Sequence, residues 1–431
     1  MQRPNIITII SHDLGRYLGC YGVPRVRSPR IDALARDGLV IENAFCVAPQ
    51  CSPSRAAMWT GRYPHSNGVV GLCHGAHAND LHPAETHLAS TLRDAGYTTW
   101  LHGPQHESRQ PEKLGFDFIN QDREADQIAT NFEQHFAQYD GAQPFFAEIC
   151  FFEPHRPFPR SEDIEVPNPE EVWIPPYLPP LDVVKDDMAK FEASVATMDR
   201  AIGRILDAVE QGGHLDNTII IVTADHGIPF PLAKMTLRDA GLEIPMIVKI
   251  PGGPSGKTST ALYTNVDFTP SLLALLEIPL PENPPLQGKA LPDVWRGTDM
   301  VGREKIYGEK TFHTYYDPMR CVRTRKWKFI VNFENAPQQE TSPDYGNNGH
   351  GYPEVAQTLG IKGTHPPFEL YDLENDPLES NNLAKDPAHA TTVAELKADL
   401  RAWMKETDDP LLQGPIPSGT YQSRMRDFCA D

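Results

Sequence analysis

No stretch of this 431-residue chain is apolar for long enough to cross a membrane. Positive charge is also scarce, because 39 Lys and Arg residues stand against 58 Asp and Glu residues and give a net charge of -19. Phosphate contacts need basic side chains, so this balance argues against a nucleic-acid-binding protein. An anionic substrate stays open, since local positive charge in a cleft can outweigh the global sign. We therefore expect no membrane partner and no nucleic-acid partner.

Cysteine is sparse too, with seven residues scattered along the chain. Their spacing is not that of a metal-binding motif, and their odd number suits a reducing compartment. The sequence begins Met1-Gln2-Arg3-Pro4 and then enters a predicted strand, so a signal peptide is not evident. The expected localisation is cytoplasmic, or periplasmic or secreted if a signal peptide was removed.

What the chain does have is a series of short, continuous apolar runs of the kind that form buried parallel strands. They lie at residues 5–10, 97–101, 144–150, 218–222 and 246–250, separated by amphipathic segments such as 31–38 and 189–210. This pattern predicts an α/β fold, with a large, doubly wound, mixed but mostly parallel sheet flanked by helices.

After about Pro292 the pattern changes. Residues 305–308, 319–324, 327–332 and 368–372 are short β-type segments, and residues 392–407 have helical periodicity. We expect a catalytic α/β domain over residues 1–300. Residues 301–431 are expected to form a smaller subdomain with an antiparallel sheet and a terminal helix.

Polar side chains follow several of the predicted parallel strands. His12-Asp13 and Asp225-His226 each come at the end of a buried run, and His106 and His155 lie in loops after two others. Ligands of doubly wound sheets bind beyond the carboxyl ends of strands, which places these residues where a metal or substrate can sit. Taken singly, each is equally typical of a polar strand end or a solvated loop.

Cys51 stands just before a run with helical character, and Pro53 suits the first turn of that helix. A helix N-terminus favours an anion and lowers the pKa of a thiol. The alternative interpretation is a buried structural cysteine followed by a helix cap.

Cys51-Ser52-Pro53-Ser54-Arg55, continued by Ala56, Thr60, Gly61 and Arg62, resembles the signature of the type I, formylglycine-dependent sulfatases of the alkaline phosphatase superfamily. Further family motifs recur in order at residues 4–6, 11–13, 223–227 and 369–372. Four stretches most resemble the heparan N-sulfatase (sulfamidase) branch, at residues 67–72, 227–231, 318–320 and 403–410.

This resemblance implies a set of site residues. The implied catalytic residues are Cys51, converted to formylglycine as the nucleophile, with Arg55, His106, His155 and Lys234. His155 is expected to protonate the leaving group, His106 to accept a proton from the hydrate, and Lys234 to contact a sulfate oxygen. His313 and Arg320 are expected to bind the anionic groups of a sugar.

The implied metal ligands are His12, Asp13, position 51, Asp225 and His226. The family resemblance suggests one divalent ion, Ca²⁺. Two imidazole ligands instead favour Mn²⁺ or Zn²⁺, because Ca²⁺ prefers oxygen ligands. The chain also departs from the family at Pro104, where a lysine is usual.

The resulting hypothesis is a sulfohydrolase that removes sulfate from an N-sulfated or O-sulfated sugar. A phosphonate monoester or phosphodiester hydrolase on the same scaffold is the alternative, and a non-catalytic binding protein is the third interpretation, raised by Pro104. The expected partners are a sulfated saccharide or other small sulfated substrate, and a formylglycine-generating or anaerobic sulfatase-maturing enzyme. A homo-oligomer is compatible with the sequence.

Overall fold

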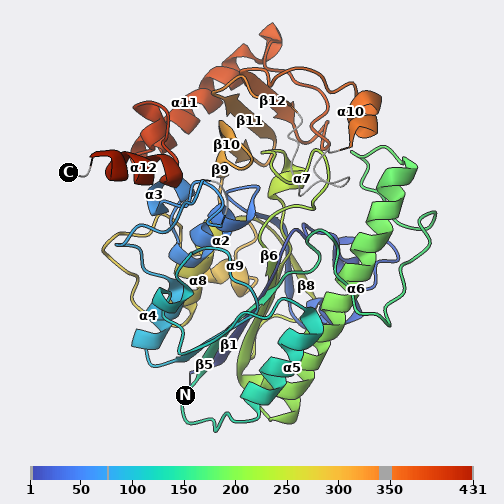
Figure 1. Cartoon of the computed structure of the whole chain (residues 1–431), viewed down its shortest axis with the longest axis vertical. Helices are drawn as coiled ribbons and strands as arrows, with labels where there is room; N and C mark the ends of the chain where they lie inside the picture. The colour runs from blue at the N-terminus through green and yellow to red at the C-terminus, as the bar shows by residue number, and fades with distance from the viewer. Residues whose placement is uncertain (1–2, 75–76, 339–351, 430–431) are drawn as a thin grey trace.

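The computed structural model describes residues 3–74, 77–338 and 352–429. It contains an eight-stranded sheet covered by helices and a separate four-stranded sheet built from the C-terminal part of the chain (Figure 1). The predicted fold class, a mostly parallel mixed sheet with a smaller antiparallel sheet, is confirmed.

The large sheet has the strand order β4-β3-β5-β1-β6-β7-β2-β8. All neighbours are parallel except that β7 is antiparallel to both β6 and β2. The strands are β1 (Asn5–Ser11), β2 (Leu39–Phe45), β3 (Thr98–His102), β4 (Phe118–Asn120), β5 (Phe145–Phe151), β6 (Thr218–Ala224), β7 (Met246–Lys249) and β8 (Lys257–Thr264). The central strands β1, β5 and β6 are buried at every residue, as their apolar sequences predict.

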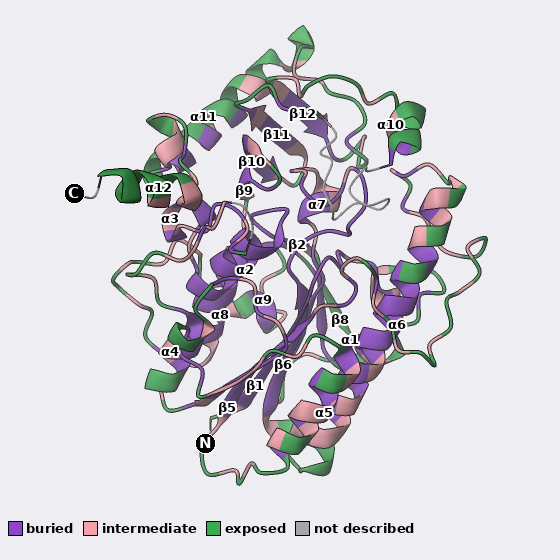
Figure 2. Ribbon diagram, in the orientation of Figure 1, coloured by how far each residue is buried: buried purple, intermediate pink, exposed green. Residues whose placement is uncertain are grey.

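Helices cover both faces of this sheet. In Figure 1, α5 and α6 lie on one side, and α2, α4 and α8 lie on the other. The helices of the large domain are α1 (Pro29–Asp37), α2 (Cys51–Thr60), α3 (Pro64–Asn67), α4 (Leu88–Asp94), α5 (Ala125–Phe136), α6 (Asp182–Gln211), α7 (Asp239–Leu242), α8 (Phe268–Leu275) and α9 (Pro292–Trp295). All ten residues of α2 are buried, so this helix lies inside the molecule (Figure 2).

The small sheet is antiparallel, with the order β12-β11-β10-β9. Its strands are β9 (Lys305–Phe312), β10 (Tyr316–Thr324), β11 (Trp327–Asn332) and β12 (Phe368–Asp372). The remaining helices are α10 (Pro353–Leu359), α11 (Ala390–Glu406) and α12 (Gly419–Cys429). Val322, Phe329 and Leu370 of the sheet share an apolar cluster with Leu400 and Trp403 of α11. The predicted C-terminal helix therefore covers one face of the small sheet.

Several elements are not predicted by the sequence patterns, and α5, β8 and α12 are the longest of them. β8 begins Lys-Thr-Ser-Thr and exposes Lys257, Thr258 and Thr260, because it is the edge strand of the large sheet. No helix in the described part of the chain combines the length and the apolar character that a membrane-spanning helix needs.

Arg320 and Asp409 join the end of α11 to the small sheet. Arg320 is fully buried on β10, and its Nε and Nη2 atoms donate to the two carboxylate oxygens of Asp409 at 2.6 and 3.1 Å. Its Nη1 atom donates to the carbonyl oxygen of Lys310 at 3.0 Å. A bidentate pair of this kind fixes the orientation of both side chains. Because the pair is buried, each charge is stabilised by its partner in place of water.

We predict that Asp409→Ala destabilises the protein by about 3 kcal/mol, because it removes the bidentate anion of the buried Arg320 guanidinium and leaves only Glu309, at 3.4 Å, beside it. Chemical denaturation followed by circular dichroism measures the change. Glu395→Ala, which removes an exposed carboxylate from the same helix α11, is the control and should change stability little. Equal stability of the two variants would contradict a stabilising role for the pair.

Candidate active site

The candidate site is assembled at the carboxyl ends of four neighbouring strands, β3, β5, β1 and β6. His12 and Asp13 follow β1, and Asp225 and His226 follow β6. The last residues of these two strands, Ser11 and Ala224, are paired in the parallel register. The two dipeptides therefore leave the sheet side by side, as doubly wound sheets favour for ligand sites.

Asp13 is held in an unusual backbone conformation. Its φ angle is 53°, in the left-handed region that non-glycine residues seldom adopt. Its N–H group donates to Asp225 Oδ1 at 2.9 Å, which links the two strand ends through backbone and side chain. The contact compensates the strain and orients both carboxylates toward one centre.

Cys51 is the first residue of α2, as predicted, and is only 2% exposed. Its Sγ atom lies 3.3 Å from His226 Nε2 and 3.8 Å from Asp13 Oδ1. The start of the buried helix thus brings the thiol to the strand-end residues.

The donor set fits one divalent metal ion. His12, Asp13, Cys51 and Asp225 each offer a ligand atom, and these four atoms lie within 4.8 Å of one another. His226 Nε2 lies 3.1 Å from Asp13 Oδ1 and 3.6 Å from Asp225 Oδ1. His226 Nδ1 lies 2.9 Å from the carbonyl oxygen of Gly227, which fixes the ring tautomer and leaves the lone pair of Nε2 facing the carboxylates.

Lys234 binds the same carboxylate. Its buried Nζ atom donates to Asp13 Oδ1 and Oδ2 at 3.0 and 2.9 Å and lies 3.4 Å from His155 Nε2. Burial alone would raise the pKa of Asp13, but Lys234 and the nearby histidines hold that pKa below its ordinary value. The structure thus brings Lys234 and His155 to the metal-ligand group.

Arg55 reaches the centre from the first turns of α2. It is fully buried, its Nε atom donates to Asp225 Oδ2 at 3.1 Å, and its Nη1 atom contacts Cys150 Sγ at 3.5 Å. The guanidinium therefore places a permanent positive charge behind the thiol and the carboxylates.

His106 and His12 complete the inner group. Ligand atoms of His106, His12 and Cys51 lie within 4.8 Å of one another. Burial, followed by the charges of His12 and Arg55, holds the pKa of His106 well below its ordinary value. Burial and then Arg55 lower the pKa of His12 to about 4. Both imidazoles are accordingly neutral near pH 7 and can accept protons or bind a metal.

The loop that carries His106 turns at Gly103, which has a φ angle of 91° and passes so close to the carbonyl oxygen of Cys150 that a side chain would not fit. Pro104 stands in this loop in place of the lysine of the family. His102 does not replace that lysine, because its Nε2 atom contacts His135 Nδ1 at 3.2 Å on the side of α5.

Sequence reasoning missed three residues at the mouth of the site. His74 stacks on His106 with ring centroids 5.2 Å apart. Phe152 packs against His155 at 4.8 Å, and the Arg123 guanidinium lies 4.6 Å above the Phe152 ring. Arg123 and His74 are exposed. No local motif marks them, since they are distant in sequence and only the fold places them beside His106 and His155.

The two predicted substrate-binding residues are both buried. His313 is 7% exposed and follows Phe312, whose carbonyl oxygen accepts a hydrogen bond from Gln50. Arg320 is engaged with Asp409 and does not lie with the catalytic group. A substrate-binding role for Arg320 is therefore not supported, because the anion that it binds comes from the chain itself.

A second group of potential ligands consists of His87, Glu107 and Glu148, all fully or almost fully buried. His87 Nδ1 accepts the N–H of Ala89, so the neutral ring carries its proton on Nε2. That nitrogen faces Glu107 and Glu148 at 3.8 and 3.9 Å. A protonated nitrogen is not a metal ligand, so this group is a polar cluster beside the site and not a second metal centre.

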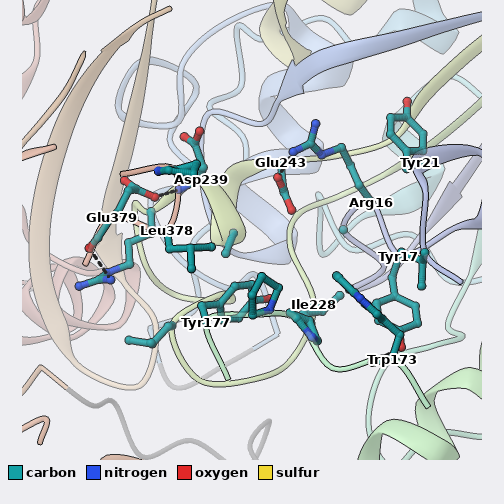
Figure 3. A pocket seen from close by; sticks show the side chains of 18 residues that line it. Arg16, Tyr17, Tyr21, Trp173, Tyr177, Ile228, Asp239, Glu243, Leu378 and Glu379 are labelled. Atoms are coloured by element: carbon teal, nitrogen blue, oxygen red, sulfur yellow. Dashed lines mark hydrogen bonds and ion pairs between the residues drawn. The ribbon is translucent and has the colours of Figure 1, made fainter. Parts of the chain in front are cut away.

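A cavity of about 360 Å³ lies on another side of the metal-ligand loops. Figure 3 shows the aromatic residues Tyr17, Tyr21, Trp173 and Tyr177 in its wall, with Arg16 directed toward Glu243. Gly15 and Ile228, which follow the two metal-ligand dipeptides, border it. No predicted catalytic or metal-binding residue of the described chain lines this cavity, so it is separate from the chemistry.

Two family models match the sequence. The model described as Sulfatase matches residues 4–278, and the model described as N-sulphoglucosamine sulphohydrolase, C-terminal, matches residues 231–348. The first of these spans both strand-end pairs, the Cys51 motif and Lys234.

Curated relatives agree with these matches. The chain is 27% identical to the human N-sulphoglucosamine sulphohydrolase, with 99% of this chain and 94% of that protein covered. It is 28% identical to an ulvan-active sulfatase of Formosa agariphila, with 95% of this chain and 76% of that protein covered.

Solved structures share the fold. One is a protein in complex with its substrate D-glucosamine-2-N,6-O-disulfate, with a TM-score of 0.75, 21% identity and coverage of 96% and 99% of the two chains. Another is a phosphonate monoester hydrolase of Agrobacterium radiobacter, with a TM-score of 0.73, 20% identity and coverage of 94% and 96%. Taken with the family models and the motif around Cys51, these findings show that the chain belongs to the sulfatase family and is related to its sulfamidase branch.

Proposed function

We propose that this enzyme releases sulfate from an N-sulfated glucosamine residue, with an O-sulfated sugar as the next candidate. The observation that supports this proposal is the meeting of Cys51 with Asp13 and His226 at the start of a fully buried helix. The similarity to N-sulphoglucosamine sulphohydrolase supports the substrate class.

We infer that His12, Asp13, Asp225, His226 and position 51 hold the divalent ion. A bound ion supplies a Lewis acid that withdraws charge from the sulfate oxygens. With two imidazole ligands, Mn²⁺ or Zn²⁺ suits the donor set better than Ca²⁺. Conversion of Cys51 to formylglycine, which needs a maturation enzyme, supplies the oxygen nucleophile.

The chain's own residues then supply positive charge, a proton for the leaving group and a proton acceptor for position 51. Arg55 offsets negative charge at position 51 and Asp225, and Lys234 is placed to bind a sulfate oxygen. His155 Nδ1 lies 2.6 Å from the carbonyl oxygen of Arg156, so Nε2 is the atom that exchanges a proton with the leaving amine or alcohol. Neutral His106 is placed to accept a proton from position 51.

The residues at the entrance of the site, above all Arg123, favour binding of a charged sugar over a plain aryl sulfate. Arg123 has no hydrogen bond or ion pair with the described residues, and its stacking on Phe152 directs a guanidinium to the entrance. We propose that Arg123 binds a second anionic group of the sugar, a carboxylate or sulfate, which a guanidinium can take bidentately. This assigns to Arg123 the role first expected of Arg320.

A phosphonate monoester hydrolase is the second candidate. The Asp225-His226 pair at the metal site favours it, since an Asp-His pair after this strand also occurs in that class, and the fold is shared with such an enzyme.

We predict faster sulfate release from N-sulfated than from O-sulfated glucosamine, and the slowest cleavage for a phosphonate monoester. The three substrates are compared on one preparation whose Cys51 peptide has the mass of the aldehyde. Cys51→Ala, the negative control, should lose activity by at least about 1,000-fold because it removes the nucleophile. Faster phosphonate cleavage than either sulfate reaction would promote the second candidate.

Metal binding gives a separate prediction. Asp13→Asn and Asp225→Asn should each lower the affinity for Mn²⁺ or Zn²⁺ by at least about 100-fold, since each removes a charged ligand. Elemental analysis after dialysis measures the bound metal. Asp199→Asn, a buried aspartate that accepts the N–H groups of Arg30 and Ile31, should keep full metal content. Stoichiometric metal in both site variants would refute the shared site.

A third prediction concerns the entrance. Arg123→Gln should raise KM for a sugar with a second anionic group by about 10-fold and leave kcat nearly unchanged, because the lost contact is charge-assisted and remote from the reacting bond. An aryl sulfate should be unaffected, and Arg36→Gln on the exposed end of α1 is the control. An equal effect on both substrates would contradict a role in sugar recognition.

A further inference from the structure

A hollow lies beneath the C-terminal helix. A cavity of about 730 Å³ is lined on one side by α12 and on the other by residues 78–83. No described residue of α12 is buried, and the first turn of the helix is anchored by the N–H of Thr420, which donates to the carbonyl oxygen of His77 at 2.9 Å. The helix therefore forms one wall of an open space and contributes little to the core.

The lining of this cavity is basic, although the chain as a whole carries a net charge of -19. Arg109, Arg424 and Arg426 contribute guanidinium groups to it, whereas the lining residue His65 is paired with Glu309 at 2.8 Å. Asp80, the acidic lining residue, already accepts the hydroxyl hydrogen of Ser108 at 2.9 Å. A concentration of cations in one hollow of an acidic protein attracts an anionic ligand.

The arginines of this cavity are not neutralised by the protein. The guanidinium groups of Arg109, Arg424 and Arg426 form no ion pair with a carboxylate of the described residues. Arg62 and Arg320 differ in this respect, since they are paired with Glu85 and Asp409. Three guanidinium groups without a protein partner offer bidentate donors to carboxylate or sulfate groups.

One wall of the cavity is linked to the residue before Cys51. Gln50 donates to the carbonyl oxygen of Phe312 at 2.7 Å, and the N–H of Phe312 donates to the carbonyl oxygen of Val70, which lines the cavity. His74 stacks on catalytic His106, and residues 78–80, a few positions further on, line the cavity. Arg109 lines the cavity, and its backbone N–H donates to Oδ1 of Asp80, another lining residue, at 3.3 Å. Arg109 on one wall and Arg424 and Arg426 on α12 thus place cationic side chains on both sides of the cavity.

We propose that the cavity under α12 binds the following sugar residues of an anionic saccharide chain whose terminal sulfated residue lies at Cys51. The inference rests on the proposed function for the identity of the ligand. The volume of the cavity falls in the range of about 300–1,000 Å³ that is typical of small-molecule sites. A polyanionic chain, unlike a single sulfate ion, matches a row of separate arginines, because its charges repeat along its length.

Binding to the inactive Cys51→Ala protein tests this inference without turnover. Calorimetry at fixed ionic strength compares a heparan sulfate disaccharide with a hexasaccharide that has the same terminal residue. The hexasaccharide should bind at least about 10-fold more tightly, since it adds charge-assisted contacts. Arg424→Gln combined with Arg426→Gln should remove this advantage and leave disaccharide binding unchanged.

The control pair is Arg401→Gln combined with Lys405→Gln, which removes the same charge from exposed positions of α11. Equal affinity for the two lengths, or an equal loss in the control pair, would overturn the site. If the wild-type enzyme releases no sulfate from either saccharide but the hexasaccharide still needs Arg424 and Arg426, the proposed function fails and the binding site stands.

Discussion

Two carboxylates and two cationic side chains lie fully buried at the carboxyl edge of the large sheet, and their mutual neutralisation is the constraint on which the site depends. Lys234 binds Asp13, and Arg55 binds Asp225. Each charge would be costly to bury alone, so the loops after β1 and β6, the first two turns of α2 and the Lys234 segment must pack together for the site to form. A divalent ion held by the proposed ligands would enter a group that is already balanced, and its positive charge would then be available to an anionic substrate.

The same constraint explains why α2 is buried on every side. A helix that begins at Cys51 and carries Arg55 in its second turn has to run into the interior to bring both side chains to the buried carboxylates. The apolar cluster around Val322, Phe329 and Trp403 then covers it from the small sheet, through contacts with Ala57 and Tyr63. The second sheet is thus part of the enclosure of the catalytic helix.

The strands and their polar ends could be predicted from the sequence because burial on both faces leaves a continuous apolar run, as at residues 218–222. The Cys51 motif was recognisable because its chemistry is local. The burial of Arg320 could not be predicted, since the resemblance of its sequence context to a family motif cannot show that Asp409, 89 residues later, lies against it. The positions of Arg123 and His74 at the mouth of the site could not be predicted either, because the residues that they contact there are distant in sequence.

The depth of Cys51 has a consequence for how the enzyme is made. An enzyme that oxidises a thiol within a recognised motif must bind the residues around it, and here all ten residues of α2 are buried and Cys51 is 2% exposed. The native state offers no such access, so any conversion has to take place on the newly made chain before α2 packs. If Cys51 is converted as proposed, folding competes in time with that conversion, and a mutation that speeds the packing of α2 would lower the active fraction without changing a residue of the site.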